Sequence, residues 1–313
     1  MAAGRDGSGN GRVLGQFIVL ALVWGASFLF IKVGLEGLSP PQVVLGRLLA
    51  GAVTLIIVSL VGRHRPPRDR AVWGHLAVVS VLMSISPFLL FAWAEQHVPS
   101  GLASIYNATT PLMTILVALA ALPGERPTRA TLGGLGLGFA GVLVLLGLGA
   151  GGSALGQAGC LLAALCYGIS YVYLRKFIAP RGLSSITIAT SQLCLAATIM
   201  LVLTPFVART PVQLSWRVVL SIGTLGIAGT GLAYIWNTNL IQAWGATKAS
   251  TVTYLIPVVG VLLGIILLGE RLSWNEPVGA LLVIAGIALS QGRLRRRRPV
   301  PEPLPEPATA PGR

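Results

Sequence analysis

Ten apolar, charge-poor windows constrain the fold of this chain more than any other feature of its sequence. Each window is about 20 residues long, which is the length that a helix needs to cross the hydrocarbon core of a membrane. Backbone groups in lipid must be hydrogen-bonded within the segment or in a closed barrel, so we expect helices rather than open strands. The windows cover residues 13–33, 41–62, 72–94, 100–122, 130–149, 154–175, 184–207, 217–240, 247–268 and 275–292.

The composition agrees with this assignment. Hydrophobic residues make up 54% of the chain and charged residues 10%, with a mean hydropathy of +0.79, whereas an ordinary soluble domain is roughly 25% charged. The first window runs on through 28–31, which makes it too long for the apolar core of a signal peptide. The sequence therefore predicts an all-α, polytopic membrane protein that keeps its first helix.

The net charge of +14 reflects membrane topology rather than a nucleic-acid-binding surface. If the N-terminus is cytoplasmic, the cytoplasmic segments hold eighteen of the 23 basic residues and Arg47 lies within a span. Cytoplasmic loops of membrane proteins carry such an excess of Lys and Arg. We expect a multi-pass protein of the plasma membrane with both termini in the cytoplasm and no nucleic-acid partner. Four basic residues remain on the opposite side: Lys32, Arg209, Arg217 and Arg271.

The sequence also repeats itself. Residues 92–126 and 235–271 share the order of a Trp, a Ser/Thr-rich stretch, a Pro and a final Gly-Glu-Arg, and residues 24–28 match 167–171 upstream. Each half holds five windows, and because five is odd, the second half must enter the membrane upside down, as in many transporters. The predicted segments are a cytoplasmic N-terminal segment (1–12), two inverted five-helix repeats (13–149 and 150–292) and a basic, Pro-rich cytoplasmic tail (293–313).

These features resemble a known family. The Trp24-Gly-Ala-Ser27 opening, the Arg47 of the second span, the duplicated block ending in Gly-Glu-Arg and the ten spans are similar to the drug/metabolite transporter superfamily, in its ten-helix EamA-type branch. The resemblance implies a secondary transporter, often an exporter, with a central cavity formed by helices 1–4 and 6–9. Substrates in that superfamily range from amino acids and nucleosides to polyamines, drugs and sugars, so the resemblance selects none of them.

Arg47 is the sharpest candidate for substrate binding. An Arg at the centre of a spanning helix costs about 2.5–3.5 kcal/mol on insertion scales, and such charges usually face a cavity or a partner. Its counterpart in the second half is the neutral Gln192. Binding of an anionic group, pairing with a helix end and extension towards the headgroups all remain open for Arg47.

Aromatic and amide side chains complete the expected binding site. Aromatic faces bind apolar or cationic groups, and amides form hydrogen bonds without carrying a charge; the alternative is that the aromatic residues mark the membrane interfaces. The predicted substrate-binding residues, besides Arg47 and Gln192, are Trp24, Ser27, Trp93, Tyr106, Asn107, Tyr167, Tyr171, Trp236, Asn237 and Tyr254.

Other duplicated residues suggest moving parts. A proline removes a backbone hydrogen bond and bends a helix, and paired interruptions in two repeats point to a transport site; plain helix packing is the alternative. The predicted gating or hinge residues are Pro111, Pro257, Glu125, Arg126, Glu270 and Arg271.

Glu95 and His97 follow the third span and could relay protons, because His titrates near physiological pH. The alternative is that both simply lie in the outer loop.

No metal, cofactor or catalytic motif is found in the sequence, so we expect neither an enzyme nor a bound cofactor. The predicted function is a secondary transporter that exports small metabolites, amino acids or amphipathic compounds by alternating access. Its partners are the small-molecule substrate and the lipid bilayer, and a homodimer is left open. The alternatives are a non-transporting scaffold or regulatory subunit and, less favoured, a membrane-embedded lipid-modifying enzyme.

Overall fold

The computed structural model describes residues 6–121, 128–146, 153–208, 210–244, 250–271 and 273–290. Every regular element in these ranges is a helix. Within these ranges eight helices are long and apolar enough to cross a membrane, and the ninth and tenth windows form the shorter apolar helices Val252–Leu268 and Asn275–Ser290. The predicted all-α polytopic fold is confirmed.

Successive spans run in opposite directions, and five of them are built from more than one helical element. The uninterrupted spans are α1 (Asp6–Gly34), α2 (Pro40–Val61), α7 (Arg129–Leu146), α9 (Ser185–Val207) and α14 (Asn275–Ser290). The composite spans are α3–η1–α4 (Arg70–Ser80, Val81–Ile85, Ser86–Ala94), α5–α6 (Ser100–Asn107, Thr110–Ala121), α8–η2–η3 (Ala154–Tyr173, Leu174–Ile178, Ala179–Arg181), α10–η4–α11 (Trp216–Gly226, Ile227–Leu232, Ala233–Trp244) and η5–α13 (Ser250–Tyr254, Ile256–Leu268).

The two ends of the bundle differ in their described charged residues: one holds most of the Glu side chains, and the other holds most of the Lys and Arg side chains. At one end α1, α4, α7, α9 and α13 finish and α2, α5, α8, α10 and α14 begin; we call it the acidic end because it holds Glu36, Glu95, Glu270 and Glu276. We call the other end the basic end. Its described basic residues include Arg63, Arg65, Arg68, Arg70, Arg175, Lys176 and Arg181.

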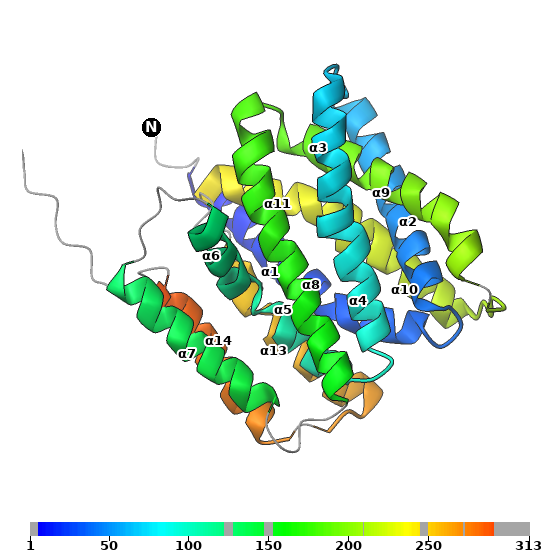
Figure 1. The fold of residues 1–313 in the computed structure, drawn as a ribbon. Helices are drawn as coiled ribbons and strands as arrows, with labels where there is room; N and C mark the ends of the chain where they lie inside the picture. Colours follow the sequence, from blue (N-terminus) through cyan, green and yellow to red (C-terminus); the bar gives the residue numbers. More distant parts are fainter. Residues whose placement is uncertain are drawn as a thin grey trace, which may run out of the picture.

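The spans of the two predicted repeats interleave. Helix α2 packs on α9 and η4, α1 packs on α13 and α10, and α8 packs on α4 and α6. The fifth and tenth spans, α7 and α14, lie side by side at one edge of the bundle (Figure 1). Glycines allow this contact: a Cβ atom on Gly286 would lie 2.5 Å from the backbone N of Gly138, and small residues bring membrane helices close together.

The helices are interrupted at corresponding places in the two halves. The third and eighth spans each contain a π-helix, η1 and η4, in their middle. The fourth and ninth spans each break directly before a proline, so that Pro111 and Pro257 stand in the first turn of α6 and α13. A proline at that position loses no helical hydrogen bond, and π-helical segments occur frequently at functional sites.

Candidate functional site

Arg47 lies on α2 inside the bundle and is 9% exposed. Its guanidinium carbon stands 3.6 Å from the ring centre of Phe88 on α4, which is a cation–π contact. Its Nε donates a hydrogen bond to Thr230 Oγ1 on η4, at 2.9 Å. The charge is therefore held by a ring from one half of the chain and a hydroxyl from the other.

The described part of the chain offers the Arg47 guanidinium no carboxylate partner. Among the residues that the structure describes, no Asp or Glu forms an ion pair with Arg47, and only its Nε has a hydrogen-bond acceptor. A buried charge without an opposite charge is costly. The two Nη groups could therefore bind a carboxylate in the paired geometry that guanidinium favours.

Gln192 on α9 makes the corresponding contact from the second half. Its side-chain Nε2 donates to Ser84 Oγ on η1 at 3.1 Å, and Ser80 Oγ donates to the backbone carbonyl oxygen of Gln192 at 2.8 Å. Thus Arg47 and Gln192 each reach a hydroxyl on the π-helix of the other half. On η4, the Thr230 hydroxyl also donates to Leu225 O at 3.1 Å, so it meets a backbone acceptor while receiving the bond from Arg47.

Two tyrosines connect these contacts. Tyr234 on α11 lies close to Gln192, Ser84 and Arg47, and Tyr167 on α8 also lies close to Arg47. Tyr171, one turn further along α8, is 45% exposed and close to Tyr234. We call the following residues the central polar cluster: Arg47, Ser84, Gln192, Thr230, Tyr167 and Tyr234.

Three of the predicted binding residues belong to this cluster, namely Arg47, Gln192 and Tyr167, and a fourth, Tyr171, lies beside it. Ser27 lies nearby on α1, since a Cβ atom on Gly229 of η4 would be 3.1 Å from Ser27 Oγ, although that hydroxyl donates to Val23 O in its own helix.

The structure places the other predicted residues outside this cluster. Trp24 and Trp236 pack around Leu20 and Leu240, and Tyr254 packs against a separate apolar core. The Tyr106 hydroxyl is fully buried and donates to Gln157 Oε1 at 2.8 Å, which makes it a packing residue in this conformation. The remaining three are Trp93, whose ring contacts His97 at a tilted angle near the acidic end, and the half-buried Asn107 and Asn237.

Sequence reasoning missed Ser84, Phe88, Thr230 and Tyr234. Tyr234 carried a usable signal, because it precedes Trp236 by two residues just as Phe91 precedes Trp93 in the matching block. The two hydroxyl residues carried none, since nothing in the local sequence announces a π-helix.

At the acidic end, the Glu270 carboxylate binds the start of α5. Its Oε1 accepts a hydrogen bond from the Ser100 backbone N at 2.7 Å, and its Oε2 accepts one from Gly101 N at 3.0 Å. A carboxylate at a helix N-terminus satisfies free N–H groups and the helix dipole together. A Cβ atom on Gly264 would lie 2.3 Å from Glu270 Oε2, so a larger residue there would displace the carboxylate. The matching Glu125 and Arg126 lie outside the described residues, and Arg271 is exposed.

Lys32 joins two further elements at this end. Its ammonium donates to the backbone carbonyl oxygens of Glu95 and Val98, the latter at 3.1 Å. Glu95, directly after the third span, is fully buried, and neither carboxylate oxygen has a hydrogen-bond partner among the described residues. Burial raises the pKa of Glu95 well above its usual range; Lys32 opposes this rise and Glu270 adds to it. His97 is exposed and donates from Nδ1 to Trp93 O at 3.0 Å, and no described contact joins it to the Glu95 carboxylate.

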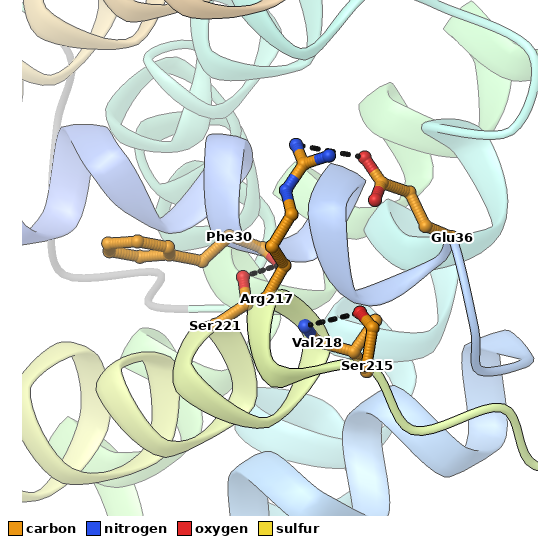
Figure 2. A network of polar contacts seen from close by, with 6 residues as sticks. All are labelled: Phe30, Glu36, Ser215, Arg217, Val218 and Ser221. Atoms are coloured by element: carbon orange, nitrogen blue, oxygen red, sulfur yellow. Dashed lines mark hydrogen bonds and ion pairs between the residues drawn. The ribbon is translucent and has the colours of Figure 1, made fainter.

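A polar network ties α10 to α1 beside this group (Figure 2). Arg217 pairs with Glu36 at 3.4 Å, and Ser221 Oγ donates to the Phe30 carbonyl at 2.8 Å. Ser215 Oγ accepts from Val218 N at 3.3 Å and caps α10. The ion pair is about half exposed and so contributes little to stability.

Known proteins similar to this chain are membrane transporters. The inner membrane transporter YedA of Escherichia coli K12, named as uncharacterized, is 26% identical over 95% of this chain and 97% of its own length. A probable amino-acid metabolite efflux pump of Salmonella typhimurium LT2 is 26% identical over 90% of this chain and 95% of its own length. A probable terminal-alkyne amino-acid exporter of Streptantibioticus cattleyicolor is 26% identical over 91% and 96%.

The fold and the family agree with these relatives. A solved crystal structure superposes with a TM-score of 0.63 over 91% of this chain and 99% of that chain, at 20% identity, which shows a shared fold. The model of the EamA-like transporter family matches residues 13–147 and again residues 154–291. Since these two matches cover most of the sequence, the chain belongs to the EamA-like transporter family.

Proposed function

We propose that this protein exports small metabolites that carry a carboxylate, amino acids foremost, by alternating access across the plasma membrane. The observation that carries the proposal is Arg47, a buried guanidinium that has no carboxylate partner among the described residues and whose two Nη groups have no described acceptor. An intramembrane charge of this kind commonly marks a substrate pathway. Two of the similar proteins are named as amino-acid exporters or efflux pumps, which supports the same substrate class.

The walls of the central polar cluster suit such a substrate. Tyr167 and Tyr234 offer aromatic faces for an apolar or cationic side group, while Gln192 and Ser84 offer neutral hydrogen bonds. One strong charge with aromatic and amide neighbours fixes the carboxylate and tolerates variation elsewhere in the substrate.

We assign the basic end to the cytoplasm, because of the excess of Lys and Arg on that side. Both termini are then cytoplasmic, and the acidic end faces outward. In this assignment Glu270 acts as an outer gate, since its two bonds to the start of α5 must break when that end opens. Pro111 and Pro257 act as hinges, because each marks a break in a span. The homodimer stays a prediction.

The test compares metabolites in cells and medium for cells that express wild type, Arg47→Ala or an empty vector. We expect carboxylate-containing compounds to accumulate outside only with wild type. Gln157→Leu, which removes a buried polar residue away from Arg47, controls for general disturbance of the bundle. Equal profiles from all strains, with the protein confirmed in the membrane, would contradict export and favour a non-transporting subunit.

A further inference from the structure

Three charged side chains from separate elements meet at the acidic end. Lys32 lies on α1, Glu95 follows α4, and Glu270 lies between α13 and α14. All three line one cavity of about 400 Å³. This cavity therefore reaches from the surface at that end to the buried Glu95. Its other lining residues are Leu35, Glu36, Gln96 and Leu268.

The three charged groups differ in their hydrogen-bond partners. Both carboxylate oxygens of Glu270 accept hydrogen bonds from backbone N–H groups of α5. The Lys32 ammonium donates hydrogen bonds to the backbone carbonyl oxygens of Glu95 and Val98. Glu95 is 0% exposed, and both of its carboxylate oxygens lack a hydrogen-bond partner in the described part of the chain. A buried carboxylate without hydrogen bonds is strongly disfavoured, and the neutral acid avoids that cost.

We propose that Glu95 is a proton-binding site that couples the entry of protons to export, with Lys32 as its electrostatic partner. This inference rests on the proposed function and names its driving ion. A proton from water in the cavity adds to a Glu95 carboxylate oxygen and forms the neutral acid. When the transporter faces the cytoplasm, the same O–H bond breaks and the proton passes to water on that side, so that no other reactant is needed.

The surrounding charges explain how the proton could act on the conformation. Lys32 and, more weakly, Arg47 favour the charged form of Glu95, while Glu270 opposes it; Cys160 on α8 is the titratable neighbour on the remaining side. Loss of the proton creates a carboxylate that attracts the Lys32 ammonium away from the carbonyls of Glu95 and Val98. Those two hydrogen bonds hold α1 to the segment before α5. The protonation state of Glu95 therefore controls a contact between two elements at the outer end of the bundle.

The direction of the pKa shift agrees with this geometry. An ordinary Glu has a pKa of about 4.3 and stays ionised at neutral pH. Burial raises the pKa of Glu95, which brings proton binding towards the physiological range. The shift also means that the folded state binds this proton more tightly than the unfolded chain. The contribution to stability is therefore full at acidic pH and is lost as the pH rises.

The first test measures proton binding without any substrate. Purified protein in lipid is titrated by infrared difference spectroscopy, and the carbonyl band of the protonated carboxyl group is followed from about pH 5 to pH 9. We expect a band that titrates in wild type and is missing in Glu95→Gln. Glu36→Gln is the matched control, since Glu36 lines the same cavity but is exposed and paired with Arg217. An unchanged band in Glu95→Gln would overturn the site.

Lys32→Gln separates the partner from the site. Removing the ammonium takes away a charge that favours the carboxylate, so the band should persist to higher pH than in wild type. A midpoint that does not move would overturn the partnership of Lys32.

The second test measures coupling. Liposomes containing the protein are loaded with a radiolabelled amino-acid mixture, and efflux is compared with and without an acidic outer solution. We expect the gradient to accelerate efflux through wild type and Glu36→Gln, and to have no effect on Glu95→Gln. Equal efflux by wild type with and without the gradient would overturn the coupling. If wild type moves none of the mixture, amino-acid export fails, and the infrared titration still decides whether Glu95 binds the proton.

Discussion

The two halves of the bundle make the same contact with different chemistry. Arg47 on α2 reaches Thr230 on the π-helix of the eighth span at 2.9 Å, and Gln192 on α9 reaches Ser84 on the π-helix of the third span at 3.1 Å. Both bonds run from the second span of one half to the third span of the other. The shared geometry joins the halves, while the difference puts a positive charge on one side only. We infer that the hydrogen bonds belong to the fold and the charge belongs to substrate recognition.

The strongest way to break the comparison is to remove each donor in turn. Arg47→Ala should lower the efflux rate of a carboxylate substrate about 10- to 150-fold, because hydrogen bonds to a charged group are worth roughly 1.5–3 kcal/mol. Gln192→Ala should lower it only a few-fold, because only a neutral bond is lost. Efflux from loaded liposomes, normalised to the amount of protein, measures both. If Arg47→Ala and Gln192→Ala lowered the efflux rate equally, the charge of Arg47 would have no specific role in substrate recognition.

At the acidic end, the contact of Glu270 with the start of α5 involves a charged group that we do not assign to substrate binding. Gly264→Ala should push the Glu270 carboxylate from Ser100 and Gly101, because the new Cβ atom would lie 2.3 Å from Oε2. We expect the free energy of unfolding in detergent to fall by about 1–3 kcal/mol. The preference for carboxylate substrates should remain. The control is Gly223→Ala on α10, where a Cβ atom meets nothing within 4 Å; equal stability of the two variants would contradict the gate contact.

Exchanging the donors sharpens the comparison. The double variant Arg47→Gln with Gln192→Arg moves the charge to the other half, where the Ser84 hydroxyl can accept a hydrogen bond from it. The efflux rate of the double variant should be about tenfold higher than that of Arg47→Gln alone, because hydrogen bonds to a charged group are worth roughly 1.5–3 kcal/mol. The two positions share their geometry and lie near the same tyrosine, Tyr234. Recovery is judged against Arg47→Gln in the same liposomes. No recovery would show that the surroundings of the two positions, and not only their charges, differ.

The smallest effect is expected at the acceptors. Thr230→Val keeps the side-chain shape and removes the acceptor of Arg47, and polar contacts between membrane helices are worth about 0.6–1.7 kcal/mol. The KM for the substrate should therefore rise about 3- to 18-fold. Ser84→Ala should raise the KM less, because Gln192 carries no charge to be oriented. A larger effect from Ser84→Ala would reverse the assignment of the two halves.

The sequence predicted the architecture well for a physical reason. The apolar windows are long, and their limits are set by charges and prolines, so each of the ten windows corresponds to a helix of the structure. Arg47 and Gln192 could be selected as well, because a charged or amide side chain is conspicuous in an apolar span. The same reasoning placed Trp24 and Trp236 at the site, although the structure packs them around Leu20 and Leu240.

The acceptors and the outer charges could not be selected in this way. Thr230 and Ser84 matter because η1 and η4 are π-helical, and a π-turn depends on tertiary contacts rather than on local composition. Lys32 looked like an ordinary loop-side charge, yet its ammonium binds carbonyls 63 and 66 residues away. His97 looked like the natural partner of Glu95, but the turn after α4 directs its ring onto Trp93. The spacing of residues in the sequence does not predict the direction of side chains that follow the end of a helix.

The measurement that tests the central claim most directly compares an acid with its neutral amide. Binding of an amino acid and of the corresponding amino-acid amide is measured by isothermal titration calorimetry on purified wild type and Arg47→Gln in lipid nanodiscs. If Arg47 binds the carboxylate, wild type prefers the acid by at least about tenfold, as expected for a charge-assisted bond of 1.5–3 kcal/mol, and Arg47→Gln binds both alike. An equal preference in wild type and Arg47→Gln would contradict the account.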